Sequence, residues 1–243
     1  MRILGFGLPS LETGLRRALR LTLPDGNAVD LGAGSGMYTR PLARRFPGKT
    51  IAYDSSNTAI EQLCERLGKK PWAPDITCQN VLHLQIPPNT LASACIGMTG
   101  FVHKEAAESL YAMVWAALLP GGILHGEFAT HRDDTEQSVF ILSGCVELPP
   151  GSGSYYHSCG HTYCQHTLAG ILGGSYWDVD EIHKFVKALG PVELIHANTY
   201  EWHQKVEDGG SVQRWLRSIH TITVQKQPRG RHYASPSLNT YPY

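Results

Sequence analysis

The feature that most constrains this chain is a glycine-rich turn between an apolar stretch and an amphipathic one. A buried strand is predicted over residues 27–32, and an amphipathic helix is predicted from about Met37 to Phe46. Between them lie Gly32, Gly34 and Gly36. Glycine lets the backbone turn sharply and approach a ligand where any Cβ would collide. The order strand, glycine turn, helix therefore predicts a doubly wound α/β fold with a ligand over the turn.

A carboxylate follows at the end of the next predicted strand, over residues 49–53. This residue, Asp54, lies about 20 positions beyond the turn. An acid at this distance is where doubly wound folds hold the two ribose hydroxyls of a nucleoside. The alternative is that Asp54 serves as the N-cap of the following helix, a role that is compatible with ribose binding.

The spacing of the glycines bears on which nucleoside is bound. The dinucleotide fingerprint requires a glycine one place after Gly36, and Met37 occupies that position. Gly-x-Gly-x-Gly with Asp30 ahead of it instead resembles motif I of the class I S-adenosylmethionine-dependent methyltransferases. The resemblance covers about residues 25–226 and implies S-adenosyl-L-methionine as the cofactor. It further implies cofactor contacts for the motif and for the residues after the second strand, namely Asp30, Gly32, Ala33, Gly34, Gly36, Asp54 and Ser55.

The rest of the pattern is typical of the same fold. Strands alternate with helices, which indicates a parallel sheet wound on both faces. We expect a Rossmann-like, seven-stranded, mostly parallel sheet that closes with an antiparallel C-terminal hairpin. The predicted strands are 27–32, 49–53, 75–79, 91–97, 121–129, 191–199 and 216–225, and the predicted helices are 11–23, 37–46, 56–68 and 104–119.

Residues 1–226 are expected to form one domain, and residues 227–243 a disordered tail. Residues 131–176 break the alternating rhythm and read as an insertion that covers the site, with a possible helix near 135–143 and a loop over 149–154. The next helix is predicted to begin after Asp178, with Glu181 at the capping-box position.

The remaining cofactor contacts follow later strands. The family commonly places an Asp beside the adenine amino group, where this chain has Asn80 followed by Val81. An Asn carbonyl accepts the same hydrogen bond. Met98 follows the fourth strand, at the face where cofactor and acceptor meet.

Acceptor contacts are expected at the C-terminal ends of the fourth and fifth strands and in the insertion, because ligands of open α/β sheets bind outside those ends. His131 directly follows the fifth strand and is the candidate general base. The alternative for His131 and His103 is an exposed turn residue. The substrate-binding candidates are Phe101, His103, Glu127, Tyr155, Tyr156 and Trp177.

The segment from Tyr155 to His166 is rich in Cys and His, but its spacing does not match the Cys-x2-Cys pairs of structural zinc sites. We predict no metal. An aromatic lid over the acceptor and a plain surface loop or strand are the other interpretations.

Composition limits the partners. The chain has 243 residues with 21 basic and 21 acidic side chains. No global field attracts nucleic acid, so we expect no nucleic-acid substrate. No apolar run has transmembrane length, and the six scattered cysteines are typical of reduced thiols. We therefore expect a cytoplasmic protein with a small-molecule substrate and no membrane partner; the oligomeric state stays open.

The leading hypothesis is a methyltransferase that acts on a small molecule by in-line displacement. The alternatives are a non-catalytic or metal- or metalloid-sensing binding protein on the same fold, and a nicotinamide-dependent oxidoreductase, which Met37 disfavours. The residues 190–226 also resemble the closing hairpin of tellurite-resistance and thiopurine-type methyltransferases. That resemblance favours a soft, thiol-like acceptor, but the identity of the acceptor and the need for a base stay open.

Overall fold

The computed structural model describes residues 2–4, 10–97, 99, 102, 104–130, 145–147, 154–157, 173–175, 177–208 and 211–228. The elements in chain order are β1 (Arg2–Leu4), α1 (Thr13–Ala18), β2 (Asn27–Leu31), α2 (Thr39–Arg45), β3 (Thr50–Asp54), α3 (Asn57–Leu67), β4 (Asp75–Cys78), the 3-10 helix η1 (Val81–His83), β5 (Leu91–Ile96), α4 (Lys104–Ala117), β6 (Leu118–Ala129), β7 (Cys145–Glu147), β8 (Ser154–His157), β9 (Gly173–Ser175), α6 (Val179–Ala188), β10 (Val192–Asp208) and β11 (Ser211–Lys226).

The main sheet has the strand order β1-β10-β11-β6-β5-β2-β3-β4. The pairs among β6, β5, β2, β3 and β4 are parallel, whereas β10 and β11 are antiparallel to their neighbours. This is the predicted seven-stranded, mostly parallel sheet with an antiparallel closing hairpin. The short strand β1, which pairs with β10 through Arg2 and Glu207, adds an eighth strand that the sequence pattern did not predict.

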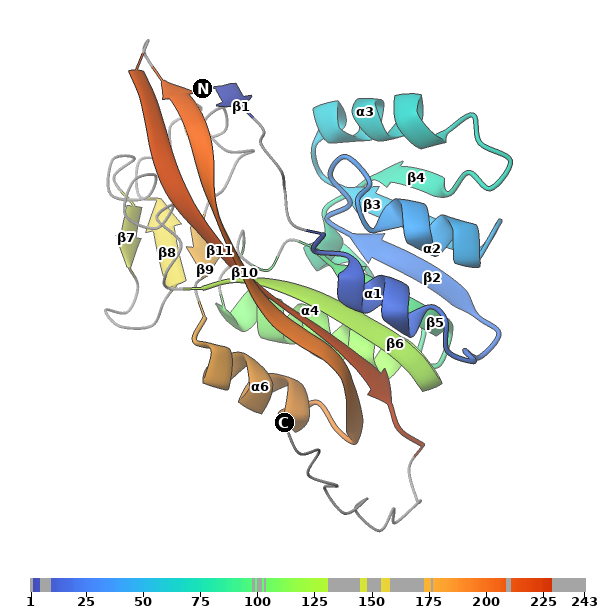
Figure 1. Cartoon of the computed structure of the whole chain (residues 1–243). Coiled ribbons are helices and arrows are strands. Elements are labelled where there is room, and N and C mark those ends of the chain that lie inside the picture. Colours follow the sequence, from blue (N-terminus) through green and yellow to red (C-terminus); the bar gives the residue numbers. More distant parts are fainter. Residues whose placement is uncertain are drawn as a thin grey trace, which may run out of the picture.

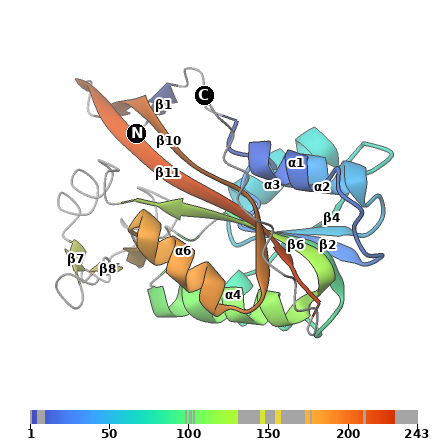
Figure 2. The same cartoon turned by 60° about the horizontal axis from the view of Figure 1, so that its bottom comes forward.

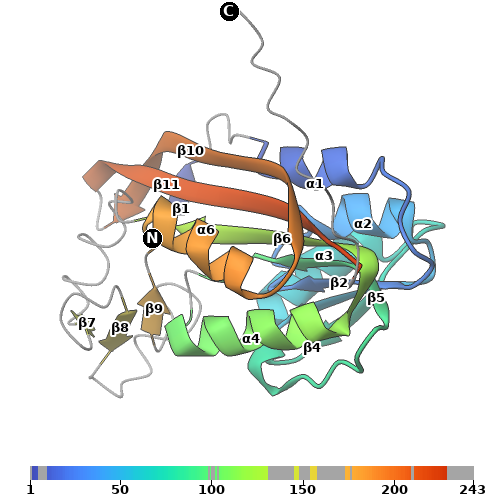
Figure 3. The ribbon, with the colours of Figure 1, turned by 90° about the horizontal axis from the view of Figure 1, so that it is seen from below.

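Helices cover both faces of the sheet (Figure 1 and Figure 2). On one face, α1 and α2 bury Leu15, Leu42 and Phe46 against the sheet, and α3 adds a small cluster around Leu63. On the other face, α4 and α6 enclose the largest apolar cluster, which includes Tyr111 and Phe128. The view in Figure 3 shows β6, β10 and β11 lying between α1 on one side and α4 with α6 on the other.

Helix α1 and strand β6 differ from their predicted bounds. The helix predicted over 11–23 is only Thr13–Ala18. Leu11, Leu15 and Leu19 are buried, as expected for a helix that packs beside the sheet, but the helix ends with Leu19 as its C-cap. Pro24 in addition disfavours helical backbone at Leu23. Strand β6 begins at Leu118 rather than at 121. Its pairing with β5 is irregular at the start: Leu118 pairs with Leu91, and the next pair is Ile123 with Ser93. Residues 120–122 lie within this irregularity of the ladder.

The insertion leaves the main sheet and returns to it at one point. Thr130, directly after β6, forms a parallel bridge with Trp177, and the Trp177 backbone N–H donates to the Ala129 carbonyl at 3.0 Å. Between these positions β7, β8 and β9 form a separate antiparallel sheet. The residues 135–143, where a helix was predicted, lie outside the described residues, as do residues 229–243 of the predicted tail.

Helix α6 begins where the capping pattern predicts. Its N-cap is Asp178, and the Asp178 backbone N–H donates to Glu181 Oε2 at 3.3 Å. The closing hairpin is longer than predicted, since β10 and β11 pair from Val192 and Lys226 to Asp208 and Ser211. Only Ile219–Gln225 of β11 pair with β6, so the distal half of the hairpin extends beyond that strand (Figure 1).

Candidate cofactor site at the glycine turn

The glycine turn is joined to the neighbouring strand β3 by backbone hydrogen bonds. The N–H groups of Gly32 and Ala33 both donate to the Tyr53 carbonyl at 2.9 Å. Gly32, Gly34 and Gly36 have φ values of 77°, 51° and 89°, a left-handed backbone that side-chain-bearing residues rarely adopt. The turn is therefore built by backbone conformations that favour glycine at all three positions.

The space around two of these glycines is different. A Cβ on Gly34 would have no atom within 4 Å, whereas a Cβ on Gly36 would overlap Leu63 Cδ1 of α3. The open space over Gly34 is what a bound ligand requires. Gly36 is required both by its backbone conformation and by its packing against α3. The sequence pattern indicated the turn and the ligand, but not this packing.

Asp54 lies at the end of β3 and faces this turn. Its Oδ2 accepts from the Gly34 N–H at 2.8 Å, and its Oδ1 accepts from the Ser56 N–H at 2.9 Å. Two backbone donors thus fix the orientation of the carboxylate, and each oxygen retains capacity for another hydrogen bond. The N-cap of α3 is Ser56, whose hydroxyl accepts from the Ala59 N–H at 3.3 Å, so Asp54 does not serve as that cap. Ser55, between them, is exposed.

The predicted adenine contacts follow β4. Asn80 Oδ1 accepts from the Leu82 N–H at 3.0 Å, which begins η1, while Val81 is buried. The amide carbonyl predicted to face the adenine therefore already has one partner, and its second lone pair is the one that a ligand amino group would use. Met98 lies outside the described residues.

Asp30 is fully buried below the turn. Thr39, the first residue of α2, donates its hydroxyl to Asp30 Oδ2 at 2.5 Å. Asp30 Oδ1 has no hydrogen-bond partner among the described residues, although it is buried. Burial raises the pKa of Asp30 to about 7, with smaller contributions from the charges of Asp54 and Glu127.

A second carboxylate, Glu127 of β6, lies on the same face of the sheet. The hydroxyl of Tyr38, a residue that is only 4% exposed, donates to Glu127 Oε2 at 2.7 Å. The sequence pattern indicates Glu127 as an acceptor contact but does not predict a role for Tyr38 or Thr39. Both lie at the start of α2, shortly after Gly36, and that position was the available signal.

The structure describes only some of the predicted acceptor contacts. Phe101, His103 and His131 are outside the described residues. Tyr155 and Tyr156 belong to β8 of the small sheet. Trp177 is 1% exposed and packs against Phe128 and Phe185, with ring centroids 5.4 Å away in each case. The structure thus places Trp177 inside the apolar core that α4 and α6 enclose.

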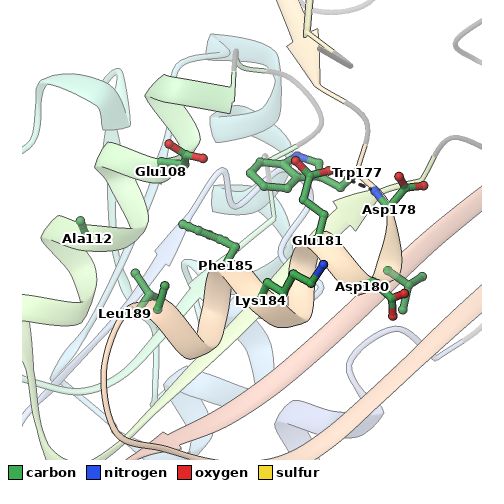
Figure 4. Close-up of a pocket in the computed structure, with 11 residues that line it drawn as sticks. Glu108, Ala112, Trp177, Asp178, Asp180, Glu181, Lys184, Phe185 and Leu189 are labelled. Carbon is green, nitrogen blue, oxygen red and sulfur yellow. Dashed lines mark hydrogen bonds between the residues drawn. The ribbon is translucent and has the colours of Figure 1, made fainter. Parts of the chain in front are cut away.

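A groove of about 1150 Å³ lies along α6 and the neighbouring α4 (Figure 4). Phe185 and Leu189 extend from α6 toward α4, and Glu108 and Ala112 line the α4 side. These helices cover one face of the sheet, whereas Asp30 lies on the other face, together with α1 and α2. The groove is therefore separate from the glycine turn.

Comparisons with known proteins agree with this geometry. Residues 28–122 match the family described as a methyltransferase domain. Trans-aconitate 2-methyltransferase of Variovorax paradoxus is 26% identical over 82% of this chain and 70% of its own length. Its counterpart from Paracidovorax citrulli is 32% identical over 44% of this chain and 40% of its own length. The chain therefore contains a methyltransferase domain.

Solved structures of this methyltransferase fold superpose along most of the chain. A methyltransferase from Methanosarcina mazei has a TM-score of 0.54 and 16% identity, with 84% of this chain and 93% of that chain covered. One from Clostridium acetobutylicum has a TM-score of 0.57 and 13% identity, with 90% and 92% covered. These matches confirm the predicted fold class.

S-adenosyl-L-methionine is accordingly the cofactor of this methyltransferase. The residues present fit it. The space over Gly34 is open, the Asp54 carboxylate is held in one orientation, and the buried Asp30 Oδ1 has no hydrogen-bond partner among the described residues. None of the described helices is long and apolar enough to cross a membrane.

Proposed function

We propose that this methyltransferase transfers the methyl group of S-adenosylmethionine to a small molecule that carries a carboxylate. Methyl transfer is supported by the Asp54 carboxylate at the end of the parallel strands, which accepts a hydrogen bond from the Gly34 N–H. The space beside Gly34 is open, as a bound cofactor requires. The acceptor class is supported by the two relatives named trans-aconitate 2-methyltransferase. They favour a carboxylate over the soft, thiol-like acceptor expected from the closing hairpin.

The cofactor supplies an electrophilic methyl group on a good leaving group, so the chain has to align the acceptor and exclude water. We assign Asp54 to the ribose hydroxyls, Asn80 and Val81 to the adenine, and the backbone of Gly32–Gly36 to the methionine part. Each assignment rests on the position of the residue at the C-terminal end of its strand.

The insertion 131–176 is the proposed cover of the acceptor. It leaves β6 at Thr130 and returns at Trp177, beside the C-terminal end of β6, where acceptors of this fold bind. The proposed acceptor contacts, taken from the sequence pattern, are Phe101, His103, Glu127, Tyr155 and Tyr156. Trp177 is left out of this set, because it is buried against Phe128 and Phe185.

A carboxylate acceptor is already ionised at neutral pH and needs no general base. His131→Ala should therefore change the rate of the chemical step less than about threefold. A hydroxyl or nitrogen acceptor would lose about 10²–10⁴-fold, the usual contribution of general acid–base catalysis. A large defect at unchanged cofactor affinity would assign His131 as a base and argue against the carboxylate.

The decisive experiment is a turnover assay after calorimetric measurement of cofactor binding. The panel contains trans-aconitate, saturated and unsaturated di- and tricarboxylic acids, and small thiols, with S-adenosylhomocysteine and the methylated product detected by mass spectrometry. Methyl ester formation from the acids supports the proposal. Turnover of thiols alone would restore the soft acceptor, and cofactor binding without any turnover would favour the non-catalytic alternative.

A further inference from the structure

The helices α4 and α6 lie side by side and run in the same direction. At their N-terminal ends, Lys104 Nζ donates to both carboxylate oxygens of Glu181, at 2.9 and 3.0 Å. At their C-terminal ends, a Cβ on Gly190, which follows α6, would lie 2.9 Å from the indole nitrogen of Trp115 on α4. The groove of about 1150 Å³ lies between these two contacts and therefore follows α6 from end to end (Figure 4).

The floor of the groove is apolar. Phe185 and Leu189 of α6 are half-buried and extend toward α4, where Ala112 is exposed. Ile182 and Val186, on another stripe of α6, are buried in the apolar cluster beneath the helix. Helix α6 therefore has two apolar stripes, one packed into the core and one open to the groove, where a bound segment would cover it.

The rim of the groove is acidic. The acidic lining residues are Glu108, Asp178, Asp180 and Glu181, and the basic lining residue is Lys184. Glu181 has Lys104 as its counter-ion. Glu108 and Asp180 are exposed and belong to none of the ion pairs that join described residues. A segment that carries positive charge and some apolar surface would complement this lining.

The chain leaves β11 at one end of this groove. Lys226 Nζ, at the end of β11, donates to the carbonyls of Trp115 and Leu118 at 2.8 and 2.6 Å, where α4 ends. The Gln227 backbone N–H donates to the carbonyl of Pro191, just after α6, at 3.0 Å. The chain beyond Gln227 therefore starts beside the C-terminal ends of both helices.

The segment that follows has the complementary charge. Residues 229–243, which lie outside the described residues, begin with Arg-Gly-Arg-His-Tyr and contain no acidic side chain. Helix α6 with its two cap residues is about 17 Å long, a distance that about five extended residues span. Arg229 and Arg231 are therefore within reach of the acidic rim, and Tyr233 is within reach of the apolar floor.

We infer that residues 229–233 bind in the groove between α4 and α6. Their two arginines pair with Glu108 and Asp180, and the segment covers the open apolar stripe of α6. Because the segment is tethered to β11, its effective concentration is on the order of millimolar, and a modest affinity is enough to hold it. Composition alone indicated a disordered tail, since it does not reveal a partner surface elsewhere in the fold. The inference does not depend on the proposed acceptor.

The test is photo-cross-linking within the full chain. His232→p-benzoylphenylalanine places a photoreactive group in the segment. After irradiation, peptide mass spectrometry should locate the cross-link on α4 or α6, and the product should migrate as a single chain. Glu108→Lys with Asp180→Lys should lower the yield at least about tenfold, because repulsion replaces attraction. Adding Arg229→Glu and Arg231→Glu should restore most of the yield.

Glu61→Lys with Glu65→Lys is the matched control, because it reverses two exposed charges on α3 and should leave the yield unchanged. Arg229→Glu with Arg231→Glu alone should lower the yield as the groove variant does, without altering the described domain. Thermal unfolding of all variants checks that the fold is retained. Cross-links outside α4 and α6, or a yield that neither charge reversal changes, would overturn the inference. Cross-links between two chains would also overturn it and would assign the groove to a second copy.

Discussion

The backbone N–H of Gly34 donates to Asp54 Oδ2 at 2.8 Å, which joins two residues 20 positions apart at the centre of the cofactor site. This bond connects the turn after β2 to the end of β3. It holds the carboxylate at the edge of the sheet before any ligand arrives. Cofactor binding then needs little rearrangement of Asp54, which lowers the cost of binding.

Asp54→Ala should weaken S-adenosylhomocysteine about 10- to 100-fold, because each hydrogen bond to a charged group contributes about 1.5–3 kcal/mol. Calorimetry measures the change. Asp25→Ala is the control, since Asp25 is exposed and pairs with Lys49 away from the site. Unchanged affinity in Asp54→Ala would refute the assignment of Asp54 to the ribose.

Gly34→Ala and Gly36→Ala should separate ligand contact from packing. At Gly34 the new Cβ meets only open space, so stability should fall by about 1–2 kcal/mol from the left-handed backbone, while cofactor affinity falls sharply. At Gly36 the Cβ overlaps Leu63, and overpacking adds about 1–3 kcal/mol of destabilisation. Urea unfolding and calorimetry on both variants test this order; a larger stability loss at Gly34 would contradict it.

Deletion of residues 151–166 should abolish turnover and leave cofactor binding within about threefold. The reason is that the insertion begins and ends beside Thr130 and Trp177, whereas the glycine turn and Asp54 belong to the main sheet. Calorimetry with S-adenosylhomocysteine and a product assay give the two readouts. Loss of both turnover and cofactor binding in a folded variant would show that the segment supports the structure of the domain and does not simply cover the acceptor.

Acid should destabilise the protein through its buried histidines. Burial lowers the pKa of His125 from 6.5 to about 3. Between these values the unfolded chain binds the extra proton, so stability falls as pH is lowered below 6.5. The loss from His125 alone should be about 2 kcal/mol at pH 5, since each pKa unit is worth about 1.4 kcal/mol.

Asp30 acts in the opposite direction, because its raised pKa of about 7 makes the folded state bind the extra proton between its ordinary value and that pH. Comparison of the wild-type protein with His125→Asn cancels this contribution. The wild type should lose about 2 kcal/mol more than the variant between pH 7 and pH 5 in urea unfolding. An identical pH dependence in both proteins would show that His125 is not held neutral by burial.

Much of the fold could be predicted because its signals are local. The alternation that places β2, α2, β3 and α3, and the capping residues before α6, depend on side chains within one or two turns of each other. Asp30, Gly34 and Asp54 could be singled out for the same reason, since they lie on consecutive elements at a regular spacing. The short strands β7, β8 and β9 have too few residues for a periodic signal, and β1 is defined only by its pairing with β10.

The sequence by itself determined the glycine turn, the acid at its edge and the order of strands and helices, because hydrophobic period and glycine positions act over short distances. Only the tertiary structure decided that Tyr38 meets Glu127, 89 positions away, and that Leu63 fills the space beside Gly36. The first contact depends on the parallel register of β2, β5 and β6 and on how α2 lies across them. Register and helix packing are set by the joint burial of side chains from several elements, which no single segment encodes.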